Sequence, residues 1–324
     1  MSERTKMDYS ISFKILVSFM LLLWSTLMYV SYVNQPEPKV VYKTPVKTHA
    51  VVEIEIADIK PLNVISSIKS EDVVNKFNSL RYDLNDYIVP RVIVATLPTD
   101  LNKLSIPEKK ELFVKIVLPL ILHENESINH ERNLAIFNIN RDTEGSRLIM
   151  AYLYKKYRIS TNSATNPIIK TDEELLTKIM PIPVSLVLAQ TAIESGWGTS
   201  YFARHGNALF GQHAYKRQKS LKPRNIVAPR VAAFKTLGVS VSAYMRNLNT
   251  HLAYSDFRKK RMNLSNFKGV ILAEHLDLYS ERGAAYIKDV KQMIKYNKFD
   301  RFERHVLEDD TYRAKKSLDM ISVP

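Results

Sequence analysis

The segment 192–212, AIESGWGTSYFARHGNALFGQ, contains a single carboxylate, Glu194. Residues 195–255 contain no other Asp or Glu, and they carry nine Lys and Arg residues before the next acid, Asp256. A carboxylic acid that stays protonated at neutral pH can donate a proton to a glycosidic oxygen. Glu194 is therefore the local candidate for acid–base chemistry, and it has to act in a basic neighbourhood.

The residues before Glu194 predict a buried helix that ends just after it. Pro183 suits the first turn, the run VSLVLAQTAI is almost wholly apolar, and Ser195 and Gly196 end the pattern. Burial on the last turn raises the pKa of a glutamate, and the negative end of the helix dipole acts in the same direction. The nine cations lower that pKa, so burial must be the larger effect if Glu194 is to act as an acid.

Glycine and aromatic residues follow Glu194 in a pattern that suits a sugar polymer. Gly196 and Gly198 let a ligand approach the backbone closely. The rings available for stacking on sugars are those of Trp197, Tyr201 and Phe202. The spacing fits a second interpretation equally well, in which Glu194 is a surface residue at a helix end and Trp197 belongs to the core.

The pattern A-x-E-S-G-W-G-T-S-x-F-A-x-x-G-N-x-L-F-G-Q resembles the signature of β-N-acetylglucosaminidases that cleave peptidoglycan (glycoside hydrolase family 73), and more narrowly their Bax-like branch in Gram-negative bacteria. The resemblance extends from about residue 88 to about residue 305. It implies a mainly α (α+β) fold, in which a lysozyme-like helical domain and a small β-hairpin lobe flank a glycan cleft. The implied activity is cleavage of the β-1,4 bond after N-acetylglucosamine, without a cofactor.

The resemblance also implies roles for individual residues. It makes Glu194 the general acid, Tyr279 a catalytically important tyrosine and Tyr286 the second aromatic residue of the same motif. The positions that match the lining of the glycan cleft are Asn207, Phe210, Gly211 and Gln212.

One departure from the family pattern bears on the mechanism. Many relatives carry a second acid shortly after the β lobe, where this chain has Gly238. Retaining chemistry needs a nearby nucleophile and inverting chemistry needs a base that activates water. Three options stay open: attack by the N-acetyl group of the substrate, a distal acid such as Glu281, or a water held by Tyr279.

Other classes of protein remain as alternatives. A lytic transglycosylase also uses one Glu before Ser-Gly, although the segment GNALFGQ differs from its usual G-L-M-Q type. A glycan-binding scaffold without activity is the alternative outside enzymes. No metal site is expected, because the chain has no Cys, and His205 and His213 lack the spacing of zinc ligands.

The N-terminus predicts a membrane anchor. Residues 15–33 are uncharged and long enough to span a bilayer as a helix, and Arg4, Lys6 and Lys14 precede them. The absence of a small-residue cleavage site favours an uncleaved anchor over a signal peptide or a buried helix. We expect a single-pass protein of the bacterial inner membrane with its catalytic domain in the periplasm.

The hydrophobic periodicity and the positions of glycine and proline divide the chain into segments. The expected parts are a cytoplasmic tail (1–14), the transmembrane anchor (15–33), a spacer and linker (34–87), a leading helical region (88–165), the catalytic domain (166–305) and a C-terminal tail (306–324). The expected elements are a strand at 51–59, a β-hairpin lobe at 207–235, and helices at 70–80, 107–120 with a kink at Pro119, 126–141, 143–159, 171–180, 183–195, 237–251, 263–276 and 281–297.

The net charge of +14 predicts an anionic partner. Peptidoglycan strands, whose stem peptides carry carboxylates, fit an exported protein. The basic segment 216–224 has no accompanying nucleic-acid motif, so nucleic acid is not expected as a partner.

Overall fold

The structure is a computed structural model of the chain, and it describes residues 62–160, 168–214, 218–222, 230–264 and 268–309. All of these residues belong to one compact unit, Asp58–Pro324. The expected membrane anchor (15–33) and the expected strand at 51–59 lie outside the described residues. None of the helices in the described part combines the length and the apolar character needed to cross a bilayer.

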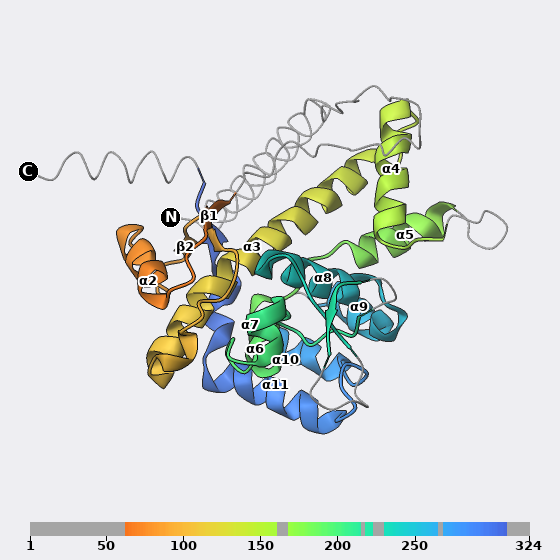
Figure 1. Ribbon diagram of the computed structural model, residues 1–324. Helices are drawn as coiled ribbons and strands as arrows, with labels where there is room; N and C mark the ends of the chain where they lie inside the picture. Colours follow the sequence, from red (N-terminus) through yellow and green to blue (C-terminus); the bar gives the residue numbers. More distant parts are fainter. Residues whose placement is uncertain (1–61, 161–167, 215–217, 223–229, 265–267, 310–324) are drawn as a thin grey trace, which may run out of the picture. The chain divides into compact units, whose positions relative to one another are not determined.

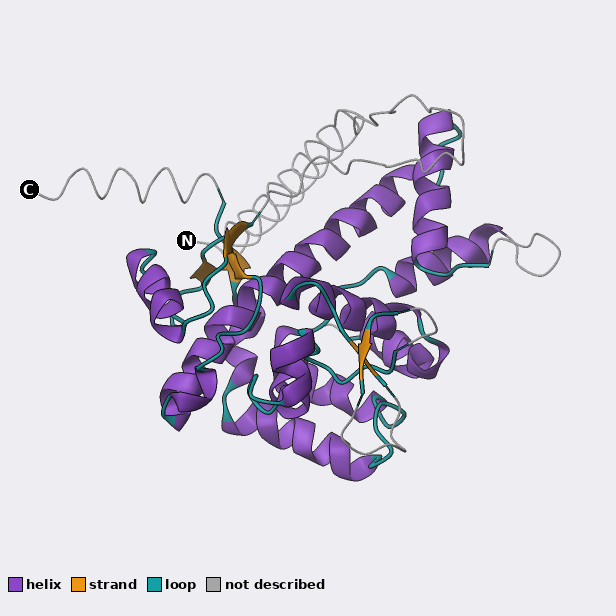
Figure 2. Cartoon of the chain, viewed as in Figure 1, coloured by secondary structure: helices purple, strands orange, loops and turns teal. Residues whose placement is uncertain are grey.

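The described part is mainly helical, as the sequence predicts, with three short strand pairs (Figures 1 and 2). The α-helices are α2 (Ser70–Ser79), α3 (Ile106–Asn138), α4 (Glu144–Lys156), α5 (Ile168–Lys178), α6 (Val184–Ser195), α7 (Tyr201–Gly206), α8 (Leu237–Thr250), α9 (Ser255–Met262), α10 (Gly269–Leu272) and α11 (Ala284–Tyr296). The 3₁₀ turns are η1 (Leu101–Lys103), η2 (Leu252–Tyr254), η3 (Ala273–His275) and η4 (Phe299–Arg304).

Helix α6 lies at the centre of the core, packed against α3, α10, α11 and η4 (Figure 1). Every residue from Val184 to Ala192 is buried, because a helix that is apolar on all sides must be enclosed by other elements. The first turn of α6 is approached so closely by Gly269 that a Cβ there would lie 2.8 Å from the backbone nitrogen of Leu186. Only glycine fits at that contact.

Helix α3 is one continuous helix of 33 residues, about 50 Å long, where the sequence predicted two helices divided near Pro119. Ser105 and Glu108 form a capping box at its start. Pro119 lies inside the helix and is buried together with most of residues 112–122. Burial of this apolar segment outweighs the cost of a proline in a helix, about 3 kcal/mol.

Two further expectations were wrong. Helix α5 begins at Ile168, one turn before the predicted caps at 171–172. In place of the predicted helix at 263–276, the described residues form the short helix α10 and the turn η3, and Gly269 at the start of α10 packs closely against α6. Helix α9 was missed because it is strongly polar, with only Phe257, Arg258 and Arg261 buried.

The strands form three separate pairs. β1 (Asn63–Ile65) pairs in parallel with β3 (Val92–Val94), and β2 (Ile88–Val89) pairs in parallel with β6 (Val306–Leu307). β4 (Ser220–Leu221) and β5 (Val231–Ala232) are antiparallel and form the described part of the hairpin predicted at 207–235. Residues expected to be linker (34–87) and tail (306–324) therefore contribute β1, α2 and β6 to the fold.

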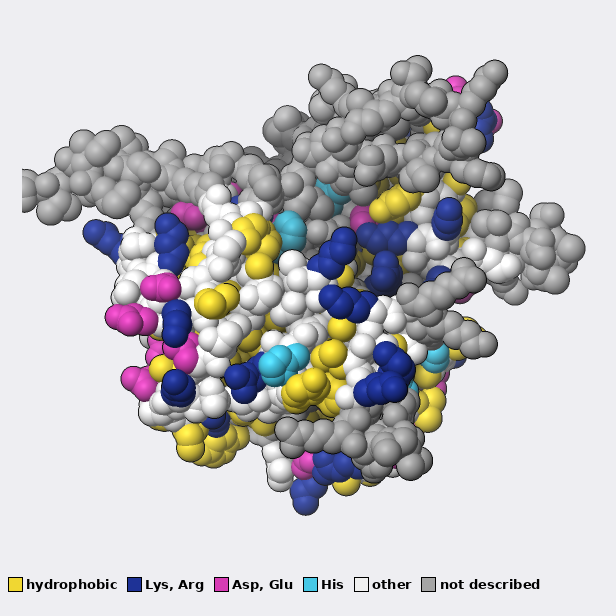
Figure 3. All heavy atoms as spheres, in the orientation of Figure 1, with side chains coloured by type: hydrophobic (Ala, Val, Ile, Leu, Met, Phe, Trp, Pro, Cys, Tyr) yellow, Lys and Arg dark blue, Asp and Glu magenta, His cyan; other side chains and the backbone are white. Residues whose placement is uncertain are grey.

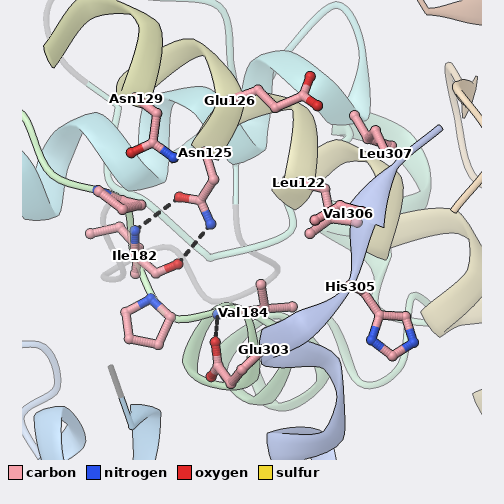
Figure 4. Close-up of a pocket in the computed structure, with 12 residues that line it drawn as sticks. Leu122, Asn125, Glu126, Asn129, Ile182, Val184, Glu303, His305, Val306 and Leu307 are labelled. Carbon is pink, nitrogen blue, oxygen red and sulfur yellow. Dashed lines mark hydrogen bonds between the residues drawn. The ribbon is translucent and has the colours of Figure 1, made fainter. Parts of the chain in front are cut away.

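Glu303 of η4 fixes the N-terminus of α6, which has no side-chain cap of its own (Figure 4). Its two carboxylate oxygens accept hydrogen bonds from the backbone N–H groups of Val184 (2.9 Å) and Ser185 (3.0 Å). The adjoining Ile182 is held by the amide of Asn125, which donates to its carbonyl and accepts from its N–H, both at 2.9 Å. Burial raises the pKa of Glu303 to about 7, although the hydrogen bonds from Ser185 and Val184 act against the rise.

Removing the Glu303 carboxylate should weaken the fold. We expect Glu303→Ala to lower the free energy of unfolding by about 1–3 kcal/mol, because two buried backbone donors lose their acceptor. Urea denaturation with an unchanged m value measures this loss. An unchanged midpoint for Glu303→Ala would show that Glu303 does not hold the start of α6.

Glu303→Gln serves as the control that cannot titrate. The pKa of Glu303 in the folded protein lies above its ordinary 4.5, so its contribution to stability is present at pH values below 4.5. That contribution is lost as the pH rises towards about 7. The parent protein should therefore lose stability relative to Glu303→Gln over this interval, and parallel pH profiles of the two proteins would contradict the assignment.

Candidate active site

Glu194 occupies the last turn of α6, where three successive left-handed residues end the helix. Gly196, Trp197 and Gly198 have φ values of 56°, 57° and 78°. The hydroxyl of Ser195 accepts a hydrogen bond from the Gly198 N–H at 2.9 Å and so closes the turn. The side chain of Glu194 points towards Gly211, where an added Cβ would lie 3.6 Å from Oε2.

Burial raises the pKa of Glu194, and this is the largest influence on the carboxyl group. A hydrogen bond from Tyr286 and the positive charge of Arg282 lower that pKa by smaller amounts. Burial thus outweighs the one cation, Arg282, that acts on Glu194 among the described residues. Arg282 is itself paired with Asp289 at 2.6 Å, and it is not one of the nine cations in residues 195–255.

A chain of hydrogen bonds orients the contact between Tyr286 and Glu194. The Tyr244 hydroxyl donates to Oε1 of Gln190, and Nε2 of Gln190 donates to the Tyr286 hydroxyl at 3.0 Å. With that donor on its oxygen, Tyr286 directs its own proton to Glu194. Tyr286 is the one hydrogen-bond donor to Glu194 found among the described residues.

Glu194 lies beside a group of four tyrosines, called here the tyrosine cluster: Tyr244, Tyr254, Tyr279 and Tyr286. The rings of Tyr279 and Tyr286 are stacked with centroids 5.4 Å apart, and Tyr244 meets Tyr279 edge-on at 6.2 Å. Burial, followed by the neighbouring tyrosines and Glu194, raises the pKa of Tyr279. Its hydroxyl therefore keeps its proton at neutral pH and acts as a donor, here to the carbonyl of Phe210 at 3.2 Å.

The segment after α7 packs against the tyrosine cluster. The Phe210 ring is stacked on Tyr244 with centroids 3.8 Å apart. Asn207 has a left-handed backbone at the end of α7, and its amide donates to the carbonyls of Phe234 and Lys235, both at 3.2 Å. Oε1 of Gln212 is buried and accepts no hydrogen bond from the described residues, so it is available to a ligand donor.

Three predicted site residues lie apart from this group. The ring of Trp197 packs against Phe113 and Phe299, with centroids 5.8 and 6.1 Å away. Tyr201 is 49% exposed and contacts Phe202 and His205. Glu281 is exposed, and no contact with Glu194 or the tyrosine cluster is found among the described residues.

The expectation that Gly198 opens the backbone to a polymer needs correction. A Cβ on Gly198 would lie 3.0 Å from the side chains of both Leu101 and Phe113, so its missing side chain serves core packing. The left-handed backbone from Gly196 to Gly198 also invalidates helical spacing beyond Ser195. For this reason the direction of Trp197 was not predictable from the sequence.

Gln190, Tyr244 and Tyr254 are the site residues that sequence reasoning missed. A signal for Gln190 was present, since it is the only amide side chain in the apolar helix α6 and precedes Glu194 by about one turn. Tyr244 lies 54 residues further along the chain, and no local pattern connects the two. Among the described residues, no group of His, Asp and Glu is arranged to hold a metal ion.

Comparison with known proteins agrees with this geometry. The model of the family described as Glucosaminidase, mannosyl-glycoprotein endo-beta-N-acetylglucosaminidase, matches residues 173–299, which include α6, the hairpin and α11. The chain belongs to this glucosaminidase family, as a Bax-like member. Protein Bax of Escherichia coli (strain K12) is 35% identical over 202 residues, which cover 59% of this chain and 71% of that protein. No solved structure matches the chain.

The hydrogen-bond chain makes a graded prediction about stability. Gln190→Leu leaves the hydroxyl of Tyr244 without its acceptor and that of Tyr286 without its donor, although Tyr286 keeps its bond to Glu194, so we expect a loss of about 1–3 kcal/mol in the free energy of unfolding. Tyr244→Phe strands only one acceptor and should cost less. Thermal and urea unfolding measure the stability of both variants. The proposed chain of hydrogen bonds is refuted if Gln190→Leu is as stable as the parent.

Proposed function

We propose that this protein is a peptidoglycan hydrolase that cleaves the β-1,4 glycosidic bond after N-acetylglucosamine, with Glu194 as the general acid. Membership of the glucosaminidase family supports a glycan hydrolase in general. The observation that carries the specific proposal is the half-buried Glu194 carboxyl, whose pKa is raised and whose hydrogen-bond partner is a tyrosine hydroxyl rather than a cation. A raised pKa increases the protonated share of such a group, and the protonated form is the one that can donate to a leaving oxygen.

In the proposed reaction, the Glu194 proton passes to the glycosidic oxygen as the bond from C1 to that oxygen breaks. The acetamido oxygen of the same sugar attacks C1 and takes up the developing positive charge. Water then attacks C1 as the bond from C1 to the acetamido oxygen breaks, which restores the acetamido group, and a proton of the water passes to the Glu194 carboxylate. Substrate assistance of this kind needs no second carboxylate, which suits a site where Glu281 is exposed and has no contact with Glu194 among the described residues.

Tyr279 supports this route as a hydrogen-bond donor. Because its pKa is raised, its hydroxyl is protonated and does not act as a base at neutral pH. It is held near Glu194 by its stacking on Tyr286 and its bond to the Phe210 carbonyl. To orient the acetamido oxygen or the attacking water, its hydroxyl turns its one proton away from the Phe210 carbonyl.

The charge of the protein supports an acidic polymer as substrate. On the face shown in Figure 3, Lys and Arg side chains are spread widely, and acidic side chains gather mostly at the left edge. Stem-peptide carboxylates of peptidoglycan match such a surface better than nucleic acid, for which the chain has no motif.

We also propose that residues 15–33 anchor the chain in the bacterial inner membrane and that the catalytic domain works in the periplasm. The support is the uncharged run of 19 residues preceded by Arg4, Lys6 and Lys14.

A lytic transglycosylase is the second candidate, and the lone acid favours it. In that reaction a hydroxyl of the substrate attacks in place of water, and one carboxyl group serves as acid and then as base. Mass spectrometry of digested peptidoglycan separates the two activities. A reducing N-acetylglucosamine end supports the hydrolase, and an anhydromuramic end overturns it in favour of the transglycosylase.

Substitution of Glu194 tests the general acid. Glu194→Gln should reduce cleavage of purified peptidoglycan by about 10²-fold or more while the fold is retained, because the amide cannot donate a carboxylic proton. The matched variant Glu281→Gln should stay within about twofold of the parent, since this carboxylate is exposed and has no contact at the site. An equal loss in both variants would make Glu281 the second acid, and a parent without activity would leave only a glycan-binding scaffold.

Removal of the Tyr286 hydroxyl tests how the pKa of Glu194 is set. The hydrogen bond from Tyr286 lowers this pKa, so Tyr286→Phe should raise it. The acid then stays protonated to higher pH, and the basic limb of the profile of kcat/KM against pH should move upward. Tyr201→Phe, which alters an exposed ring, should leave the limb in place. A downward shift in Tyr286→Phe would contradict the proposed direction.

A further inference from the structure

A cavity of about 920 Å³ lies on a different side of α6 from the Glu194 carboxylate. Its walls come from the first turns of α3, the last turns of α6 and the second half of α11. Ile193 and Gly196, the neighbours of Glu194 on α6, line it, whereas Glu194 itself faces Gly211 and Tyr286. We call this cavity the α3–α11 groove.

One wall of the α3–α11 groove is aromatic. The ammonium of Lys110 lies 4.7 Å from the centre of the Trp197 ring and 5.6 Å from the centre of the Tyr296 ring. Tyr296 is 82% exposed, and Ile106, one helical turn before Lys110, is 65% exposed. Of these two exposed side chains Tyr296 lines the groove, and an exposed ring beside a hollow suits a binding surface.

The other groups of the groove are polar and come from α11. Gln292 is exposed, and its amide forms no hydrogen bond with any described residue. Asn297 is oriented by a hydrogen bond from its amide to the Met293 carbonyl at 2.9 Å. Lys295 adds a second ammonium, and Asp289 is held by Arg282.

We propose that the α3–α11 groove binds a second stretch of the same carboxylate-bearing amino-sugar strand that is cut at Glu194. The Tyr296 ring stacks on a sugar ring, the Gln292 amide bonds to acetamido or hydroxyl groups, and Lys110 and Lys295 face the carboxylates. This assignment rests on the proposed function for the identity of the polymer. An apolar partner would bury the charges of Lys110 and Lys295 without an anionic partner.

The position of the groove next to Glu194 on α6 suggests how the groove would assist cleavage. Helix α6 carries Glu194 on one side and contributes Gly196 and Ile193 to the groove on another. A glycan strand bound at both places is held by two contacts. The contact in the groove raises the effective concentration of the strand's glycosidic bonds at Glu194. The groove should therefore matter for insoluble peptidoglycan and not for short soluble oligosaccharides.

Cosedimentation with purified insoluble peptidoglycan tests the groove directly. The parent is the full chain carrying Glu194→Gln, so that the polymer is not cut during the measurement. Tyr296→Ala in this background should weaken binding about fivefold, through loss of one stacked ring. Tyr87→Ala, at an exposed tyrosine outside the groove, is the matched control and should leave binding unchanged.

A second measurement uses chains with Glu194 intact. Tyr296→Ala should cleave short soluble N-acetylglucosamine oligosaccharides at the parent rate and insoluble peptidoglycan more slowly. Equal binding by Tyr296→Ala and its parent overturns the proposal that the groove binds the glycan strand. The proposal is also overturned if single-stranded DNA, added at a concentration of binding sites equal to that of peptidoglycan, displaces the parent from peptidoglycan. If no glycan is cleaved by any chain, the proposed function fails, yet the comparison of Tyr296→Ala with Tyr87→Ala still decides the groove.

Discussion

The candidate active site depends on one constraint, which is that the carboxyl group of Glu194 is buried away from water. Among the described residues, no cation reverses the effect of burial, and the hydrogen bond to the carboxyl group comes from the neutral hydroxyl of Tyr286. A carboxyl group in such surroundings favours its protonated form. The rest of the site follows from this constraint, because the groups around Glu194 must supply hydrogen bonds without supplying charge. Tyrosine hydroxyls and one glutamine amide meet that requirement.

Burial of Glu194 in turn requires that α6 be enclosed and fixed at both ends. Glu303 binds the first backbone N–H groups of the helix, and the left-handed turn from Gly196 to Gly198 ends it directly after Glu194. The first residue of α10 packs against the beginning of α6 with no room for a side chain. The carboxyl group is thus placed by backbone packing, which explains why a site with few charged groups can still have a defined geometry.

The sequence predicted those features that are local. The apolar run, Pro183 and Gly196 located helix α6 and placed Glu194 on its last turn, and periodicity found α8 and α11. Contacts between distant segments were not predictable: Gln190 meets Tyr286 across 96 residues and Glu303 meets Val184 across 119. No periodicity encodes such pairings, because they depend on how helices pack. The direction of the Trp197 ring was not predictable for a different reason, since positive φ angles redirect the chain after Ser195.

The pKa of Glu194 in the unmodified protein is the most direct test of this account. Carbon-13 NMR of the glutamate side chains across a pH series measures it, and Glu194→Gln assigns the resonance. The account predicts a pKa for Glu194 above the ordinary value of 4.5. A titration at or below that value would mean that the carboxyl group is ionised at neutral pH, and Glu194 would then not be the proton donor.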